Sequence, residues 1–167
     1  MTDEVPQAKR TEPDAAIVTE FDADYADAFV IENADGRPAR DWARASLRGA
    51  ESAGGAFSRL VWGGVLGFRL AERGTPDTMV GWRMSAADPD RLVLDADGRL
   101  MAGRMVFVRS GTDITWTTML RFHRPVGRHI WSVAGRAHRE LAPRCLDRAR
   151  HYFTRRSAPS SDETTRG

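Results

Sequence analysis

The spacing of apolar residues changes abruptly at Pro125, and this change constrains the fold most strongly. Before it, apolar and polar residues alternate through 80–86 and 114–123; after it, apolar residues recur every three or four positions. The first spacing is that of a strand with one buried face, and the second that of an amphipathic helix. Short strands joined by tight turns form antiparallel sheets. We therefore expect an α+β fold in which a long C-terminal helix covers the apolar face of the sheet.

The individual elements are delimited by turn and helix-start signals such as Asp97-Gly98 and Pro38. The expected strands are 25–32, 80–86, 91–95, 100–108 and 114–123. Two short helices are expected after the first strand, one over 38–48 and one from Ala56, with Phe57, Leu60, Val61, Val65 and Phe68 on one face. The sheet is expected to have one buried face.

The last helix is expected to run for about 28 residues. Its apolar stripe comprises Trp131, Ala134, His138, Leu141, Ala142, Cys145, Ala149 and Tyr152. Pro143 lies inside this run, so a kink or a break is expected there.

The two ends of the chain carry little apolar content. Residues 1–20 are polar and contain two prolines, so we expect a disordered N-terminal tail, a single domain over 21–155 and a disordered tail over 156–167. The start is acidic, and no apolar run approaches the length of a membrane span, so neither a signal peptide nor membrane insertion is expected. The single Cys145 excludes a disulfide scaffold. We expect a cytoplasmic protein.

The positive charge is concentrated near the C-terminus. Residues 121–156 hold ten arginines against Glu140 and Asp147, whereas the whole chain has a net charge of only +2. Such a segment can mark a nucleic-acid partner, or it can be a solvated helix face that meets the acidic front half of its own fold. The near-neutral total favours the second interpretation, so no nucleic acid is expected.

The predicted sheet and helix together suggest a ligand-binding interior. Alternation over 114–123 places Thr118 among apolar residues, which suits a cavity wall with a few polar groups. His138 lies within the helix stripe and is the candidate acid or base, although a histidine bonded to a backbone carbonyl or a strand side chain within the core is the favoured explanation. The expected ligand-binding residues are Trp82, Met84, Met105, Trp116, Thr118, Leu120, Trp131 and His138.

Other chemistry-bearing residues give weaker signals. Arg104 shares a strand face with Ala102 and Val106, while Met105 and Phe107 form the other face and make the better core, so Arg104 is expected on the surface. The four histidines lack metal-ligand spacing, and neither a metal nor a cofactor is expected. No nucleotide-binding or hydrolase motif is present. Cys145 is expected to be an inert core residue.

Several segments resemble the START-like, helix-grip superfamily, also called SRPBCC or polyketide cyclase-like proteins, and within it a bacterial branch of unknown function. They are Asp24–Phe29, Asp41–Ala45, Val80–Trp82, Leu100–Val108, Thr115–Thr118, Arg128–Trp131 and His138–Leu146. The resemblance implies a curved antiparallel sheet wrapped around the C-terminal helix, with an apolar ligand cavity between them. It does not imply a particular reaction.

Three functions are compatible with these observations. The first is binding of a small hydrophobic molecule (lipid-, polyketide- or aromatic-like) between sheet and helix. The alternative is an enzyme of cyclase, dehydratase or isomerase type in the same cavity, with His138 as the catalytic group. A third is an interaction protein that uses the arginine-rich helix. The oligomeric state stays open.

Overall fold

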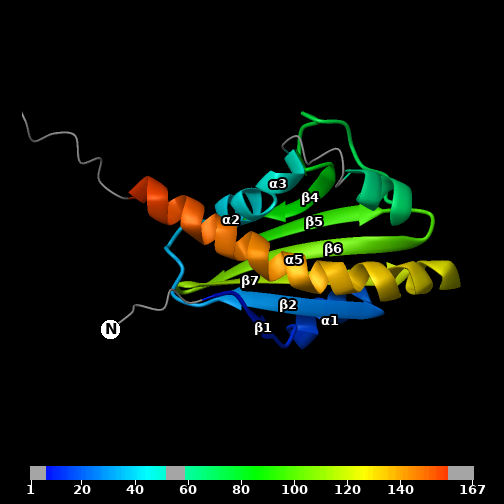
Figure 1. Ribbon diagram of the computed structural model, residues 1–167, viewed down its shortest axis with the longest axis horizontal. Helices are drawn as coiled ribbons and strands as arrows, with labels where there is room; N and C mark the ends of the chain where they lie inside the picture. Colours follow the sequence, from blue (N-terminus) through cyan, green and yellow to red (C-terminus); the bar gives the residue numbers. More distant parts are fainter. Residues whose placement is uncertain (1–6, 52–58, 158–167) are drawn as a thin grey trace, which may run out of the picture.

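The computed structural model describes residues 7–51 and 59–157 and has an α+β architecture (Figure 1). Its elements in chain order are β1 (Lys9–Thr11), α1 (Ala15–Phe21), β2 (Tyr25–Ile31), α2 (Ala39–Ser46), α3 (Arg48–Glu51), the π-helix η1 (Leu60–Val65), β3 (Thr78–Met79), β4 (Trp82–Ala87), β5 (Arg91–Asp97), β6 (Met101–Ser110), β7 (Asp113–Phe122) and α5 (Pro125–Ser157).

Seven strands form one antiparallel sheet in the order β1-β2-β7-β6-β5-β4-β3. All five strands expected from the sequence are present, and the expected α+β class with an antiparallel sheet and a long C-terminal helix is confirmed. The short edge strands β1 and β3 were not predicted, because neither is long enough to show alternation. Their pairing extends the sheet by one strand at each edge.

Helix α5 runs across one face of the sheet, as Figure 1 shows. It packs against β2 and β7, and its C-terminal half packs against α2, which itself contacts β5 and β6. The main core lies between these helices and the sheet, and includes Trp42, Phe107, Met101 and Leu146. Met101, Met105 and Phe107 belong to the main core, whereas Ala102 and Val106 lie on the other face, which confirms the predicted orientation of β6.

The opposite face of the sheet carries α1, so the prediction of a disordered tail is wrong for residues 7–20, and the sheet is buried on both faces rather than one. Residues 1–6 of the predicted tail lie outside the described residues. Asp14 caps the helix by accepting a hydrogen bond from the Ala16 N–H at 2.8 Å. Phe21 then packs with Val106 and Met119 in a second, smaller core. Few apolar residues are needed here, because the helix has only two turns.

The second helix expected after the first strand differs most from the prediction. Its start near Ala56 lies outside the described residues. The helical turn η1 follows, with Leu60 and Val65 exposed rather than on a buried face. Phe68 lies beyond the end of η1 and pairs with Gly98 in an isolated β-bridge. Glycine is required at position 98, because a Cβ there would lie 2.1 Å from the Gly67 carbonyl oxygen.

The buried face of α5 is rotated from the predicted stripe. Its buried residues are Gly127, Trp131, Gly135, Ala142, Leu146, Ala149, Arg150 and Phe153, whereas Leu141 is half exposed. The helix continues through Pro143 without a break, and Arg156 and Ser157 belong to it. The rest of the expected C-terminal tail, 158–167, lies outside the described residues. Within the described ranges, no helix combines the length and apolar character needed to cross a membrane.

Candidate functional site

A buried carboxylate on β2 meets the imidazole of α5 that the sequence singled out. Alternation along β2 places Asp27 on the same face as Phe29 and Ile31, toward α5. The Asp27 side chain is completely buried, and its Oδ1 lies 3.2 Å from Nε2 of His138, whose side chain is 18% exposed. A buried carboxylate requires such partners, because burial without them is costly.

Two further side chains extend this pair into a network. Tyr25, two residues before Asp27 on the same strand face, donates its hydroxyl to Asp27 Oδ2 at 2.6 Å. Arg139, next to His138 on α5, donates from Nη1 to the Tyr25 oxygen at 3.2 Å. Both carboxylate oxygens of Asp27 therefore have a partner, one from its own strand and one from the helix.

Aromatic rings enclose the histidine. The Trp116 ring lies 6.1 Å from the His138 ring in a perpendicular arrangement, and the Trp131 ring lies 5.4 Å from it. Tyr25 contacts Trp131 edge-on at 5.3 Å. Across the strand pair, Thr118 lies opposite Asp27, so a buried hydroxyl is adjacent to the carboxylate. The result is a small polar group within a mainly aromatic interior.

Two indole groups beside this network lack acceptors. The Nε1 atoms of Trp116 and Trp131 are buried and have no hydrogen-bond partner among the residues that the structure describes. Gly135 leaves room for the Trp131 indole, since a Cβ there would lie 3.0 Å from its Nε1. Buried indole N–H groups usually find an acceptor, so these donors are suited to a bound oxygen atom.

The contact with Asp27 determines what His138 can do chemically. A carboxylate accepts, so neutral His138 carries its proton on Nε2 and keeps a lone pair on Nδ1. Asp27 also fixes the ring orientation, which is how a carboxylate prepares a histidine for proton transfer. The arrangement can hold a hydroxyl, or remove a proton from one, at Nδ1.

The Tyr25 hydroxyl gives a measurable signature of this network. Burial raises the pKa of Tyr25 to about 12, and its hydrogen bond to Asp27 acts in the same direction, while Arg139 opposes it. Between the ordinary pKa of 10.0 and about 12, the unfolded chain loses this proton and the folded chain keeps it. Stability is therefore expected to fall as the pH rises through this window.

We predict that tyrosinate absorbance in a Tyr152→Phe variant, whose only remaining tyrosine is Tyr25, rises with a midpoint near pH 12. Adding Asp27→Asn removes the neighbouring charge and should lower this midpoint. A midpoint at the ordinary tyrosine value in the folded protein would show that Tyr25 is not held in the network.

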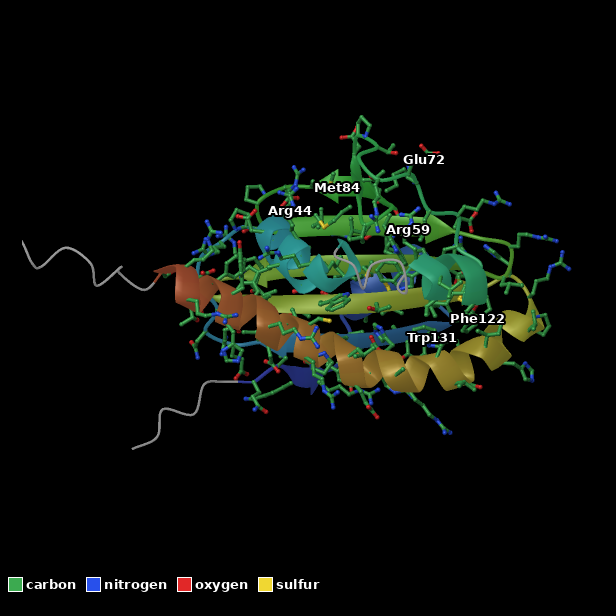
Figure 2. The ribbon with its side chains drawn as sticks, turned by 45° about the horizontal axis from the view of Figure 1, so that its top comes forward. Arg44, Arg59, Glu72, Met84, Phe122 and Trp131 are labelled. Carbon is green, nitrogen blue, oxygen red and sulfur yellow. The ribbon has the colours of Figure 1, made fainter. Side chains whose placement is uncertain are left out.

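The structure brings together some of the predicted site residues and separates others. Trp116, Thr118, Trp131 and His138 lie around Asp27, and the buried Leu120 and Met105 flank Thr118 along β7 and across on β6. Trp82 and Met84 lie on β4, three strands from β7, or about 14 Å at ordinary strand spacing. Figure 2 shows Met84 toward the β4 edge and Trp131 along α5, well separated.

Trp82 belongs instead to a separate aromatic group. Its ring contacts Phe68 at 5.0 Å and Trp62 at 5.8 Å, and it leaves no room for a Cβ at Gly103. Met84 is half-buried beside a β-bulge. Both residues belong to the main core, but near the β4 edge of the sheet and away from His138.

Arg104 faces away from the main core, as expected, but it is not simply solvated, because this face of the sheet carries α1. Its guanidinium donates to Asp95 at 2.7 Å, lies 3.5 Å from Glu20, and covers the Phe21 ring at 5.0 Å. The sequence prediction missed these partners because Glu20 fell in the presumed tail and no helix was predicted up to Phe21. Arg104 thus holds α1 against the sheet.

Tyr25, Asp27 and Arg139 were not predicted as site residues. The alternation of side chains along the strand could have indicated them. Phe29 and Ile31 lie in the core, and the two-residue period of a strand places Tyr25 and Asp27 on the same face. A carboxylate on a buried strand face is rare enough to indicate a specific partner. Cys145 is half-buried, and burial raises the pKa of its thiol, in keeping with an unreactive side chain.

Three surface hollows lie away from this network. One of about 600 Å³ is formed by α2 and the end of α5, one of about 290 Å³ lies beside Arg59 and Gly74, and one of about 540 Å³ lies between Gly63 and Arg124. Among the described residues, no group of three His, Cys, Asp or Glu side chains is placed to hold a metal ion.

Comparison with known proteins finds no matching protein family, no matching curated protein and no matching solved structure.

Proposed function

We propose that this protein binds a small, mainly apolar molecule between the sheet and α5, and that His138, held by Asp27, contacts a polar group of that molecule. The observation that carries the proposal is the completely buried Asp27 carboxylate, which holds a histidine among aromatic rings. A purely apolar contact would fasten the helix to the sheet at a lower desolvation cost than a buried ionisable pair.

The neighbouring side chains suggest the chemistry of the ligand. Trp116 and Trp131 supply flat apolar surface and two indole donors that find no acceptor within residues 7–51 and 59–157, and His138 supplies a further donor or acceptor at Nδ1. A ligand with an apolar skeleton and one carbonyl or hydroxyl oxygen matches this set. Lipid-, polyketide- and aromatic-like molecules all meet the description.

The resemblance to START-like, helix-grip proteins supports the same placement. A seven-stranded antiparallel sheet with a long C-terminal helix across one face is compatible with that architecture. In the proposal, the sheet curves around α5 and the ligand lies between them, in a protein of the cytoplasm. Trp116, Thr118, Leu120, Met105, Trp131 and His138 are the proposed contacts, and Trp82 and Met84 would lie at the far wall.

The second candidate function is acid–base catalysis in the same interior. The contact between Asp27 and His138 Nε2 favours it, because it leaves Nδ1 as the base. An isomerase step needs a proton removed from one substrate atom and returned to another, and a dehydratase step passes the removed proton to the leaving hydroxyl, which departs as water. An aldol-type cyclase step forms a carbon–carbon bond as the proton removed from the carbon nucleophile goes to the carbonyl oxygen that it attacks, and an aromatic interior would hold the substrate in a reactive conformation. Turnover lost in His138→Gln, with binding retained, would select catalysis over binding.

The test is native mass spectrometry of the protein purified from the cells that produce it. We expect a non-covalent small molecule on the wild-type chain. The occupied fraction should fall at least about tenfold in His138→Gln and in Asp27→Asn, because a lost hydrogen bond to a charged or buried partner is worth about 1.5–3 kcal/mol.

His129→Gln is the matched control, because His129 lies on the same helix but is exposed and bonds the Pro125 carbonyl of its own helix. It should keep the bound molecule. A wild-type chain that carries no small molecule, or equal occupancy in all three variants, would contradict the proposal.

A further inference from the structure

The exposed apolar side chains gather at one end of the molecule. Among the described residues, the large apolar side chains that stay exposed are Leu60, Val65, Val126, Val133 and Leu141. The first three lie on η1 and at the start of α5, and Figure 1 shows these two segments, in teal and yellow, at the same end of the sheet. Contact of such side chains with water is unfavourable, so a gathered set of them indicates a contact surface.

Packing holds η1 in place and leaves two of these side chains outside. Trp62 lies between them in the sequence, and its ring meets the Trp82 ring edge-on at 5.8 Å. Leu66, directly after the helix, is 4% exposed. Leu60 is nevertheless 63% exposed and Val65 46% exposed, although the turn that carries them is anchored in the core. Their exposure is therefore built into the fold.

A hollow of about 540 Å³ lies between η1 and the start of α5. The described residues that line it are Gly63, Gly67, Arg99, Leu100 and Arg124. Leu100 contacts both segments: a Cβ at Gly67 would lie 3.4 Å from its side chain, and one at Gly127 would lie 2.7 Å from its carbonyl oxygen. Val126 precedes Gly127 in α5, so exposed apolar side chains lie on both elements that border the hollow.

The two arginines of this hollow are available to an anionic partner. Both are exposed, and within residues 7–51 and 59–157 neither guanidinium has a hydrogen-bond or ion-pair partner. The described lining holds no carboxylate. Asp97, two residues before Arg99, is already bonded to Nε2 of His123 at 2.9 Å. Guanidinium groups bind phosphate well, because their N–H donors match two phosphate oxygens at once.

We propose that this end of the protein docks on the surface of an anionic membrane, with Arg99 and Arg124 on lipid phosphates and Leu60, Val65 and Val126 in the boundary between headgroups and acyl chains. Anionic membrane surfaces attract clustered arginines, and apolar side chains beside them enter the interface without crossing the bilayer. A soluble anion would use the arginines and leave the apolar side chains in water. The inference does not depend on the proposed function of the interior between the sheet and α5.

The test is flotation of the full chain with vesicles of phosphatidylcholine alone or of equal parts phosphatidylcholine and phosphatidylglycerol. We expect binding to the mixed vesicles, and at least about tenfold weaker binding to phosphatidylcholine alone, because the attraction to surface charge is then lost. Higher salt should weaken binding to the mixed vesicles. Soluble glycerol phosphate should release no more protein than sodium chloride at equal ionic strength, since it offers no apolar layer.

A pair of double variants tests the two arginines. Replacing Arg99 and Arg124 together by glutamine should lower the affinity for mixed vesicles at least about tenfold. Replacing Arg144 and Arg148 together by glutamine is the matched control, because it removes the same charge from exposed positions of α5. Arg144 lies about 20 residues beyond Arg124, or about 30 Å along the helix, so the control should change the affinity less than about twofold.

A second pair of variants tests the apolar contact. Leu60→Ser should lower the affinity for mixed vesicles at least about threefold, because the side chain then loses its burial in the interface. Leu141→Ser is the matched control, since Leu141 is 49% exposed but lies in the middle of α5. It should bind like the wild type.

Four results would overturn the proposal. Absence of binding to the mixed vesicles would assign the surface to an acidic protein instead. Equal binding to both kinds of vesicle would show that the arginines do not read the surface charge. Additional release by glycerol phosphate would indicate a site for a soluble phosphate. Equal affinities of a variant and its control would show that this end of the protein does not face the membrane.

Discussion

Replacing Asp27 by alanine is expected to lower the free energy of unfolding by about 2 kcal/mol, because the Tyr25 hydroxyl and the His138 N–H lose their shared acceptor inside the core. Urea unfolding, followed by the midpoint at an unchanged slope, measures the loss. Asp27→Asn keeps one acceptor oxygen and a similar volume, so it should lose less.

A double-mutant cycle between Asp27→Ala and His138→Ala separates the pair from its surroundings. We expect a coupling energy of about 1 kcal/mol, because the two side chains are in direct contact. Additive losses would mean that Asp27 and His138 do not interact, and a wild-type stability for Asp27→Ala would mean that the carboxylate is not held in the core.

Leu146→Ala is expected to cost about 3 kcal/mol, because Leu146 is completely buried between α5 and the sheet and its truncation leaves a cavity. Leu141→Ala is the matched control on the same helix. Leu141 is 49% exposed, so its truncation should cost no more than about 0.5 kcal/mol. Urea unfolding of both variants measures the difference.

This pair of variants decides which face of α5 is buried. The stripe read from the sequence contains Leu141 and omits Leu146, whereas the structure buries Leu146. Equal losses of unfolding free energy at both positions, or a larger loss at Leu141, would favour the apolar stripe predicted from the sequence and contradict the packing described above.

The strands were predictable because alternation is read locally. Residues 114–123 show it plainly, and β7 indeed places Ile114, Trp116 and Leu120 in the core. The face of α5 was not predictable in the same way, because it depends on what the helix meets. Its C-terminal half packs on α2, where Trp42 contacts Phe153, so the buried face centres on Leu146 and Phe153, and Cys145 and Tyr152 pack against the core only as partly buried residues.

The N-terminal helix shows a different limit. Asp14 as a cap and the spacing of Ile17, Val18 and Phe21 are valid helix signals. A helix of two turns with few apolar residues is nevertheless hard to distinguish from a polar tail by sequence, because its stability comes from packing on the sheet. Phe21 is buried because Val106 of β6 and Met119 of β7 lie on the sheet face that α1 covers.

The candidate site was predicted in part. His138 was identified from its place within the helix stripe, and Trp116, Thr118 and Trp131 do surround it. Asp27 and Tyr25 were not predicted, because the sequence of strand 25–32 does not show which of its polar residues face the helix. Which strand lies opposite His138 is set by tertiary packing, so the partner of the histidine could be suspected from the sequence but not assigned.

The most direct test of the central claim is the nitrogen NMR spectrum of the His138 imidazole, recorded with the co-purified molecule bound and after its removal. We expect Nε2 to stay protonated in both states, because Asp27 holds it, and the Nδ1 resonance to move when the molecule is removed. His129 should be unchanged. A His138 spectrum that is identical in the two states, while mass spectrometry shows that the molecule has gone, would contradict the claim that His138 contacts it.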